Sequence, residues 1–251
     1  MGTSLLQRAR ESQVWRSVFR HPYPQSERDE RRLARANVFL HLHPVKIERR
    51  RLRISYTWGL GGISFLLFLI LTATGILLMF YYRPTVEHAY HDMKDLEFVV
   101  PFGWFLRNLH RWAAHGMVLT VIGHMARVFY TGSYKSPREF NWGVGVLLLV
   151  LTLLLSFTGY LLPWDQLALW ATTVGTNMLR AAPVIGADGP FSVVDSGSDV
   201  AFLLLGGRSV GAAALLRFYV LHVVALPFVM AVLIMIHFWR VRKDGPLARK
   251  L

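Results

Sequence analysis

The sequence predicts an all-α membrane protein built around a bundle of four transmembrane helices. Hydrophobic residues make up 53% of the 251 positions and charged residues only 17%, which is unusual for a soluble domain. Crossing a bilayer core about 30 Å thick takes roughly 20 apolar residues in a helix. Four segments are long enough, at about residues 54–82, 106–130, 144–162 and 215–239. The chain is therefore expected to be an integral membrane protein.

The basic residues gather on one side of these four spans. Residues 1–53, 131–141 and 240–251 share that side and hold 20 Lys or Arg against 7 Asp or Glu. The connections of the other side, 83–107 and 164–217, hold 6 against 8. This positive-inside pattern predicts cytoplasmic termini in a bacterial inner or energy-transducing membrane. Topology thus accounts for most of the net charge of +13, and no nucleic-acid partner is expected.

Three regions follow from this layout. Residues 1–53 are predicted to form a basic cytoplasmic collar with an amphipathic helix at the lipid headgroups. Residues 54–240 form the helical bundle, and residues 241–251 a basic cytoplasmic tail. The long connection after the third span contains DQLALWATTVGTNML, which is interpreted as a helix lying along the membrane surface. The rest of that connection, and the one after the first span, are predicted to be loops.

Four histidines occupy two of the predicted spans at similar spacing. His110 and His124 are 14 residues apart, so in a helix they differ by about 40° in direction and about 21 Å in height. His222 and His237 are 15 residues apart, within about 60° of one face. The second and fourth spans run the same way, so His110 should meet His222 near the outer surface and His124 should meet His237 near the inner one. Facing imidazoles in a helix bundle are what six-coordinate haem iron requires.

Two other interpretations of these histidines stay open, namely hydrogen bonds between helices and a proton relay in a channel or transporter. A single histidine is more often structural, but four at matched levels on two parallel helices favour two haems. His115 points about 140° away from His110 and is not expected to bind haem. The remaining histidines are assigned to the collar (His41, His43) or to exposed loops (His21, His88, His91).

Glycines and arginines agree with the haem interpretation. The first and third spans each hold two glycines at the same separation as His110 and His124, namely Gly61 with Gly75 and Gly145 with Gly159. A haem macrocycle needs close approach of the backbone, which glycine permits, although a single glycine in a membrane helix more often serves helix packing. Arginines near both levels could pair with anionic propionates or extend to the membrane interface: Arg107, Arg111, Arg127 and Arg217.

Several motifs resemble the cytochrome b6 family of b6f complexes and the amino-terminal half of cytochrome b in bc1-type complexes. They are RNLHRW…GHMARVFYTGSYK, FTGYLLPWDQ, FYYRPTVEHAY and RFYVLH…IHFWRVRKDG, and the resemblance covers about residues 41–247. The wider spacing of the fourth-span histidines is the b6-type pattern. The chain stops after four spans, so the resemblance implies that the second half of cytochrome b is a separate, subunit IV-like protein.

The resemblance implies electron transport through two stacked b-type haems in a dimeric quinol:cytochrome c or plastocyanin-type oxidoreductase complex. Other partners would be lipid, a Rieske iron–sulfur protein and a c-type cytochrome, and the chain would not be an enzyme alone. Its iron ligands would be His110 and His222 for the outer, low-potential haem, and His124 and His237 for the inner, high-potential haem. Residues that match the outer quinol pocket are Tyr160, Pro163, Trp164 and Asp165, and Arg242 matches a position near the inner quinone site.

One departure from plant-type b6 chains concerns a further haem. Those chains carry a cysteine just before LGG in the first span, which anchors an extra haem covalently. Here Gly59 stands at that place and the chain has no cysteine at all, which excludes a thioether-linked haem. The alternative function is a di-haem, quinone-reactive membrane anchor of a dehydrogenase or hydrogenase, which would not need the PWDQ motif.

Overall fold

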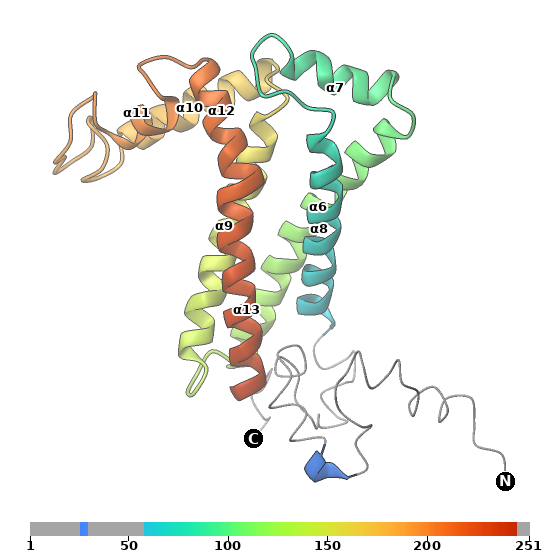
Figure 1. Ribbon diagram of the computed structural model, residues 1–251. Helices are drawn as coiled ribbons and strands as arrows, with labels where there is room; N and C mark the ends of the chain where they lie inside the picture. Colours follow the sequence, from blue (N-terminus) through green and yellow to red (C-terminus); the bar gives the residue numbers. More distant parts are fainter. Residues whose placement is uncertain (1–25, 30–57, 245–251) are drawn as a thin grey trace.

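The structure is a computed structural model that describes residues 26–29 and 58–244, and the regular elements in these ranges are helices (Figure 1). Most of the predicted collar (1–53) and residues 245–251 of the tail lie outside the described residues. From residue 58 onward the elements are α6 (Leu60–Met79), α7 (Ala89–Phe98), α8 (Gly103–Tyr130), α9 (Glu139–Leu161), α10 (Gln166–Arg180), α11 (Val200–Leu205), α12 (Ala212–Val220), the π-helical segment η2 (Leu221–Ala225) and α13 (Leu226–Asp244).

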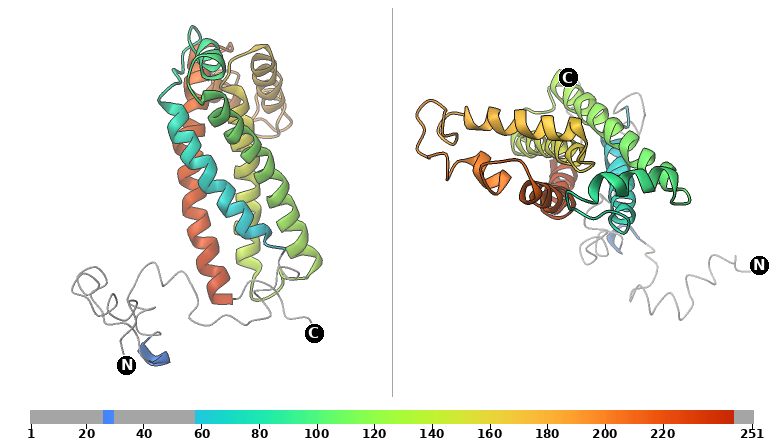
Figure 2. Two further views of the ribbon diagram at one scale, coloured as in Figure 1. Left: turned by 90° about the vertical axis from the view of Figure 1, so that its right-hand side faces the viewer. Right: turned by 90° about the horizontal axis from the view of Figure 1, so that it is seen from above.

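Four long helices run side by side and form the body of the molecule (Figures 1 and 2). They are α6, α8, α9 and a continuous helix over residues 212–244, in which α12, η2 and α13 follow one another without a break. Successive long helices alternate in direction, α6 packs against α8, and α13 packs against α9. The chain therefore enters α6 and leaves α13 at the same end, while α7, α10 and α11 lie at the other end.

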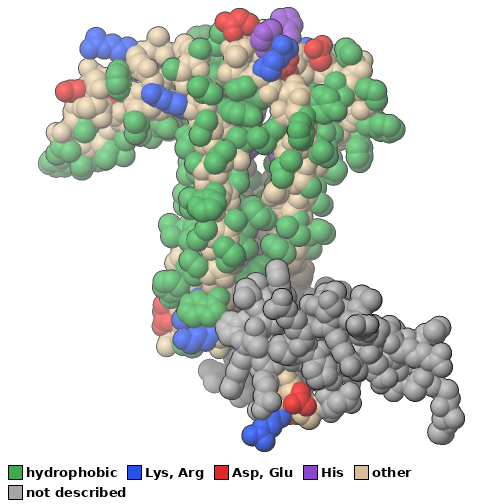
Figure 3. Space-filling model, viewed as in Figure 1, with side chains coloured by type: hydrophobic (Ala, Val, Ile, Leu, Met, Phe, Trp, Pro, Cys, Tyr) green, Lys and Arg blue, Asp and Glu red, His purple; other side chains and the backbone are tan. Residues whose placement is uncertain are grey.

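Three of the long helices have the length and composition of membrane spans: α6, α9 and the helix over residues 212–244. α8 has 28 residues but is less apolar, because it carries Arg107, Arg111 and Arg127 as well as three histidines. Figure 3 shows apolar side chains covering the shaft of the bundle, with most of the charged side chains near its two ends. Exposed leucines such as Leu66, Leu119 and Leu147 are half or more accessible. An apolar girdle between polar ends suits a bilayer.

The fold differs from the predicted layout mainly at the connection after the first span. The sequence predicts a loop between the first and second spans, whereas α7 occupies ten residues of this connection. His88 precedes this helix and His91 lies within it, and both side chains are exposed. The helix is short and polar, so it shows none of the long apolar periodicity by which the spans were recognised.

An ion pair fixes the start of this connection. Asp92, whose side chain is 4% exposed, accepts hydrogen bonds from Arg83 Nη2 at 2.6 Å, from Arg83 Nε at 3.2 Å and from the Arg83 backbone N–H at 2.7 Å. These hydrogen bonds hold the pKa of the Asp92 carboxyl below its ordinary value of 3.8. Ala89 and Leu96 lie on the same buried face of α7 as Asp92. The carboxylate thus joins the end of α6 to the helix that covers it.

This pair predicts an acid-dependent stability. Because the folded-state pKa of Asp92 is lowered, its carboxylate favours the folded chain above the unfolded pKa near 4. The contribution is lost as the pH falls through the folded-state pKa. Asp92→Asn should lower the unfolding temperature at neutral pH and show a smaller further loss on acidification. Thermal unfolding of both full-length chains in detergent, from about pH 7 to about pH 3, checks this. Equal acid dependence of the two chains would contradict it.

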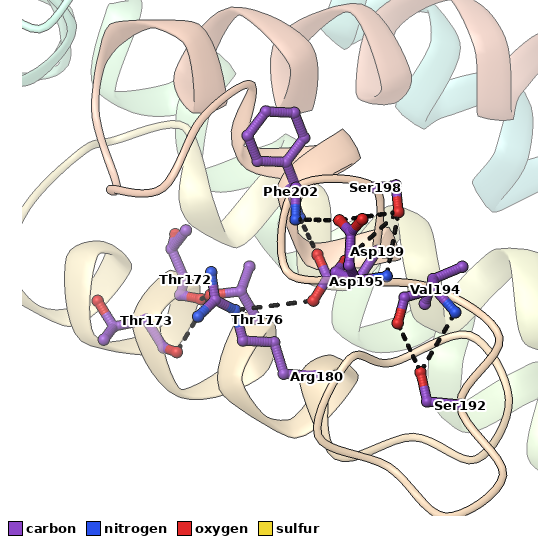
Figure 4. Close-up of polar contacts among 11 residues, drawn as sticks. Thr172, Thr173, Thr176, Arg180, Ser192, Val194, Asp195, Ser198, Asp199 and Phe202 are labelled. Atoms are coloured by element: carbon purple, nitrogen blue, oxygen red, sulfur yellow. Dashed lines mark hydrogen bonds and ion pairs between the residues drawn. The ribbon is translucent and has the colours of Figure 1, made fainter.

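The connection after α9 forms an arm that extends sideways from the bundle (Figures 1 and 2). Asp165 caps α10 by accepting from the Ala168 N–H at 2.9 Å, and Asp199 caps α11 by accepting from the Phe202 N–H at 2.7 Å. Asp199 is fully buried, and its second oxygen lies 3.9 Å from Arg180 Nε (Figure 4). Capping by aspartate satisfies otherwise unpaired N–H groups. Asp199 therefore connects the two helices of the arm, because it caps α11 and pairs with Arg180 of α10.

Two apolar clusters stabilise the bundle at different heights. The first joins the α7, α9, α11 and α12 region and includes Leu161, Leu215 and Phe218, each at most 2% exposed. The second lies within the bundle and contains Met117, Val121, Leu151 and Met230. Burying side chains of this size stabilises a fold by roughly 1.5–3 kcal/mol each in water.

Candidate functional site

The four histidines of α8 and of the 212–244 helix form two pairs inside the bundle. The ring centres of His110 and His222 lie 6.3 Å apart, with the ring planes at 71°. The ring centres of His124 and His237 are also 6.3 Å apart, with the planes at 80°. Residue 110 belongs to the end of the bundle covered by α7, and residue 124 to the other end. The helices therefore present one imidazole pair at each level.

The separation of each pair suits one metal ion bonded to both rings. A metal that bonds each ring nitrogen at about 2 Å would hold the ring centres about 6 Å apart. In the parts of the chain that the structure describes, no cluster of three or more His, Asp or Glu side chains is arranged to hold a metal. Two imidazoles alone do not complete the coordination of an ordinary metal ion. They do complete that of an iron whose other four ligands belong to a macrocycle.

Glycines of α6 and α9 lie against three of the four rings. A Cβ atom added to Gly75 would lie 3.3 Å from His110 Cε1, and one added to Gly61 would lie 3.3 Å from His124 Cε1. A Cβ on Gly159 would lie only 2.5 Å from His222 Cε1. Gly145, the fourth glycine of the predicted set, lies against Met125 rather than a histidine. Three of these positions thus admit no larger residue without displacing an imidazole.

The π-helical segment η2 explains how the wider histidine spacing of the fourth helix can match the narrower spacing in α8. His222 lies inside this segment, which interrupts the α-helical hydrogen bonding between α12 and α13. A π turn takes up one residue more than an α turn. The stretch from His222 to His237 therefore covers nearly the same rotation as the shorter stretch from His110 to His124. A periodicity of about 3.6 residues assumes a regular helix, so it does not reveal this segment.

A cavity adjoins each histidine pair. The one beside His124 and His237 has a volume of about 430 Å³, and the one beside His110 and His222 about 140 Å³. Met117, Thr152 and Met230 line both cavities, so they lie one above the other along the bundle axis. Gly61 and Gly145 line the larger cavity and Gly75 the smaller one. The space available for a flat group thus coincides with the histidines and with these three glycines.

A family model described as cytochrome b/b6/petB matches residues 49–245. The chain belongs to the cytochrome b/b6 family. Cytochrome b6 of Gracilaria tenuistipitata var. liui is 46% identical over 192 residues, which cover 76% of this chain and 84% of that protein. Cytochrome b6 of Pyropia yezoensis is 47% identical and that of Acaryochloris marina 44% identical over the same shares.

A solved structure has the same fold. It is a chain of a hyperthermophilic respiratory Complex III, with a TM-score of 0.67 and 30% sequence identity. The match covers 75% of this chain and 48% of that one. Membership in the cytochrome b/b6 family implies electron transport and b-type haem. The apolar helices and the family together make the chain an integral membrane protein.

The arginines proposed for haem propionates lie in different surroundings. Arg127 lines the larger cavity and also lies over the ring of Trp58, 4.6 Å from its centre. Arg107 pairs with Glu97 of α7 at 2.5 Å, Arg217 donates to the Leu203 carbonyl at 2.7 Å, and Arg111 is exposed. Among the four, only Arg127 borders a histidine cavity in this cytochrome b structure.

The residues that match the quinone sites lie in different surroundings. Tyr160 is 52% exposed on α9, whereas Trp164 is buried in the first apolar cluster with a φ of 51°. Pro163 follows the end of α9, and Asp165 caps α10. Arg242 lies in the last turn of α13. Their roles at quinone sites stay predictions.

His115 lies on the outer face of α8. Its side chain is exposed, and its ring contacts Trp112, with the ring centres 5.6 Å apart. Because it contacts neither histidine pair, His115→Ala should leave the haem content of the purified chain at the wild-type value. Haem quantified from the pyridine haemochrome spectrum checks this. A fall in haem content would refute the exclusion of His115 as a ligand.

Proposed function

We propose that this chain is the di-haem cytochrome b subunit of a bc- or b6f-type quinol oxidoreductase complex, and that it carries electrons across the membrane. The observation that carries the proposal is the equal separation of 6.3 Å in both histidine pairs. One metal between two imidazoles gives this separation, and it occurs at two levels of one bundle. Bound haem supplies a one-electron couple at each level.

The chain's own residues would hold two non-covalent haems in this proposal. His110 and His222 would ligate the outer iron, and His124 and His237 the inner iron. Gly61, Gly75 and Gly159 keep the backbone close to the rings, and Arg127 would pair with a propionate of the inner haem. Met117, Thr152 and Met230 separate the two cavities.

We also propose that α8, the second of the four long helices, crosses the membrane with the three apolar ones. α8 runs beside α6 along the length of the bundle (Figures 1 and 2), and its 28 residues correspond to a length of about 42 Å. Its arginines lie toward the two ends, at positions 107, 111 and 127, where long basic side chains reach the membrane surface. The end that carries residues 131–141 and 240–244 would face the cytoplasm, following the positive-inside bias.

The proposed partners follow from the kind of complex. They are a Rieske iron–sulfur protein, a subunit IV-like protein that supplies the second half of cytochrome b, a c-type cytochrome and lipid, within a dimer. Quinol would be oxidised on the side of α7 and α10, and quinone reduced on the side of Arg242. The 30% identity to a chain of a respiratory Complex III supports an assembly of this class.

Haem content and extractability test the proposal. The full chain, purified alone or within its complex, should carry about two haems, and acid–acetone should remove all of them because the chain has no cysteine. Haem that stays on the chain in a denaturing gel would contradict non-covalent binding. A chain without haem would contradict the proposed function and favour the proton-relay interpretation of the histidines. A di-haem anchor of a dehydrogenase would also bind two haems, but it would not copurify with a Rieske protein.

A further inference from the structure

We infer that Thr74 and Thr158 position the outer histidine pair through hydrogen bonds and thereby lower the reduction potential of the outer haem relative to the inner one. The inference rests on the proposed function, because it concerns the haem held by His110 and His222. It identifies two threonines, one on α6 and one on α9, as positioning residues.

Each outer histidine has a threonine hydroxyl at its Nδ1 atom. Thr74 Oγ1 lies 2.8 Å from His110 Nδ1, and Thr158 Oγ1 lies 3.1 Å from His222 Nδ1. Both threonines are buried, at 5% and 4% exposure. The two rings are therefore held by the same chemical group from two different helices.

The direction of these hydrogen bonds follows from the other partner of each hydroxyl. Thr74 Oγ1 donates to the Ile70 carbonyl at 2.7 Å, and Thr158 Oγ1 donates to the Leu154 carbonyl at 2.8 Å. A hydroxyl has one proton, and a carbonyl oxygen only accepts. With the hydroxyl proton donated to the carbonyl, the oxygen accepts from the ring, and this arrangement places the hydrogen on Nδ1 in both histidines. Nε2 is left unprotonated in both rings and is the nitrogen available to a metal.

The threonines directly precede two of the glycines that face the rings. Thr74 precedes Gly75, and Thr158 precedes Gly159. In each pair the glycine gives the imidazole its space and the threonine fixes its orientation. The corresponding residues before Gly61 and Gly145 are Leu60 and Val144, which have no hydroxyl.

One histidine of the inner pair, His237, differs from both outer histidines at the same ring atom. Among the described residues, the buried Nδ1 atom of His237 has no hydrogen-bond partner. A hydrogen bond from the distal N–H makes an imidazole a more basic ligand. A more basic ligand stabilises the oxidised iron and lowers its potential. The hydroxyls on the outer pair would thus separate the two potentials, with the outer haem the lower.

Thr74→Val and Thr158→Val test the inference in the full chain within its complex. Either change should raise the midpoint potential of the outer haem and leave that of the inner haem in place, whereas Thr74→Ser and Thr158→Ser should stay near wild type. The outer haem is identified as the wave that His110→Ala removes. Thr173→Val is the matched control, because its hydroxyl makes the same bond to a carbonyl four residues back, at 2.8 Å, and borders neither cavity.

Unchanged potentials in haem-replete valine variants, or a shift of the inner wave instead, would overturn the inference while the proposed function stands. Thr74→Ala and Thr158→Ala, which leave more space, serve if a valine variant loses the outer haem. Loss of the haem in both types of variant, with retention in the serine variants, would show that the hydroxyl is needed for binding and would overturn the effect on potential. Absence of haem from the wild type would instead refute the proposed function itself.

Discussion

Replacing His110 or His222 with alanine is expected to remove one haem and leave the other, so that the haem content falls from about two to about one per chain. The two rings lie 6.3 Å apart and serve one level of the bundle. Six-coordinate iron that loses one axial imidazole is no longer held between two helices. Haem quantification and low-temperature spectra of the b-type α-band check this result.

The reciprocal variants provide the control for this pairing. His124→Ala and His237→Ala should remove the other haem, because those rings form the second pair. The double variant of His110 and His222 should resemble either single variant, since both changes empty one site. Retention of both haems in either single variant would contradict the pairing. A variant that loses both haems because it no longer folds is recognised by a lower unfolding temperature.

Gly159→Ala is expected to have the second large effect. An alanine Cβ at this position would lie 2.5 Å from Cε1 and 3.1 Å from Nε2 of His222, closer than carbon atoms tolerate. The ring must turn away, and overpacking of this kind costs about 1–3 kcal/mol before any effect on the cofactor. The displaced nitrogen should leave the outer haem weakly bound or absent. Haem content and the outer redox wave measure this.

Gly143→Ala is the matched control on the same helix, because nothing lies within 4 Å of an added Cβ there. In a helix interior, glycine to alanine is ordinarily favourable by about 1 kcal/mol. The control should therefore keep both haems. Gly75→Ala and Gly61→Ala, with contacts at 3.3 Å, should perturb the outer and inner haem less than Gly159→Ala. An unperturbed outer haem in Gly159→Ala would show that the ring has room to move.

The long helices were predictable because apolar length is a strong signal. The third span was predicted from residue 144, and α9 begins at Glu139, while the fourth was predicted from 215 and its helix begins at Ala212. Membership in the cytochrome b/b6 family is confirmed by the family match over residues 49–245. The histidine levels followed from helical geometry and from the direction of each span. The spacing of residues along a helix is enough to predict these levels, without knowing which side chains touch.

Other features depend on contacts that a one-dimensional pattern does not contain. η2 shifts the register of the fourth helix by about one residue, and a regular 100° step does not reveal it. α7 is held by the bidentate pair of Arg83 and Asp92, which are nine residues apart. Arg107 and Arg217 are engaged by Glu97 and by a backbone carbonyl, which sequence position alone does not show.

The sequence contains a pattern that marks the threonines before Gly75 and Gly159. The pair Thr–Gly occurs once in α6 and once in α9, at the glycine nearer the α7 end of each helix. A short side chain that donates to its own helix is easily interpreted as a common back-bond in a membrane helix. Only the position of the imidazole shows that the same hydroxyl also makes a hydrogen bond to the histidine ring.

A redox titration of the purified complex, followed in the b-haem α-band with total haem quantified, shows whether each histidine pair holds one haem. We expect about two non-covalent haems per chain that titrate as separate waves, with the wave of lower potential lost in His110→Ala. A single haem, or two haems that both survive His110→Ala, would contradict the assignment of one haem to each histidine pair.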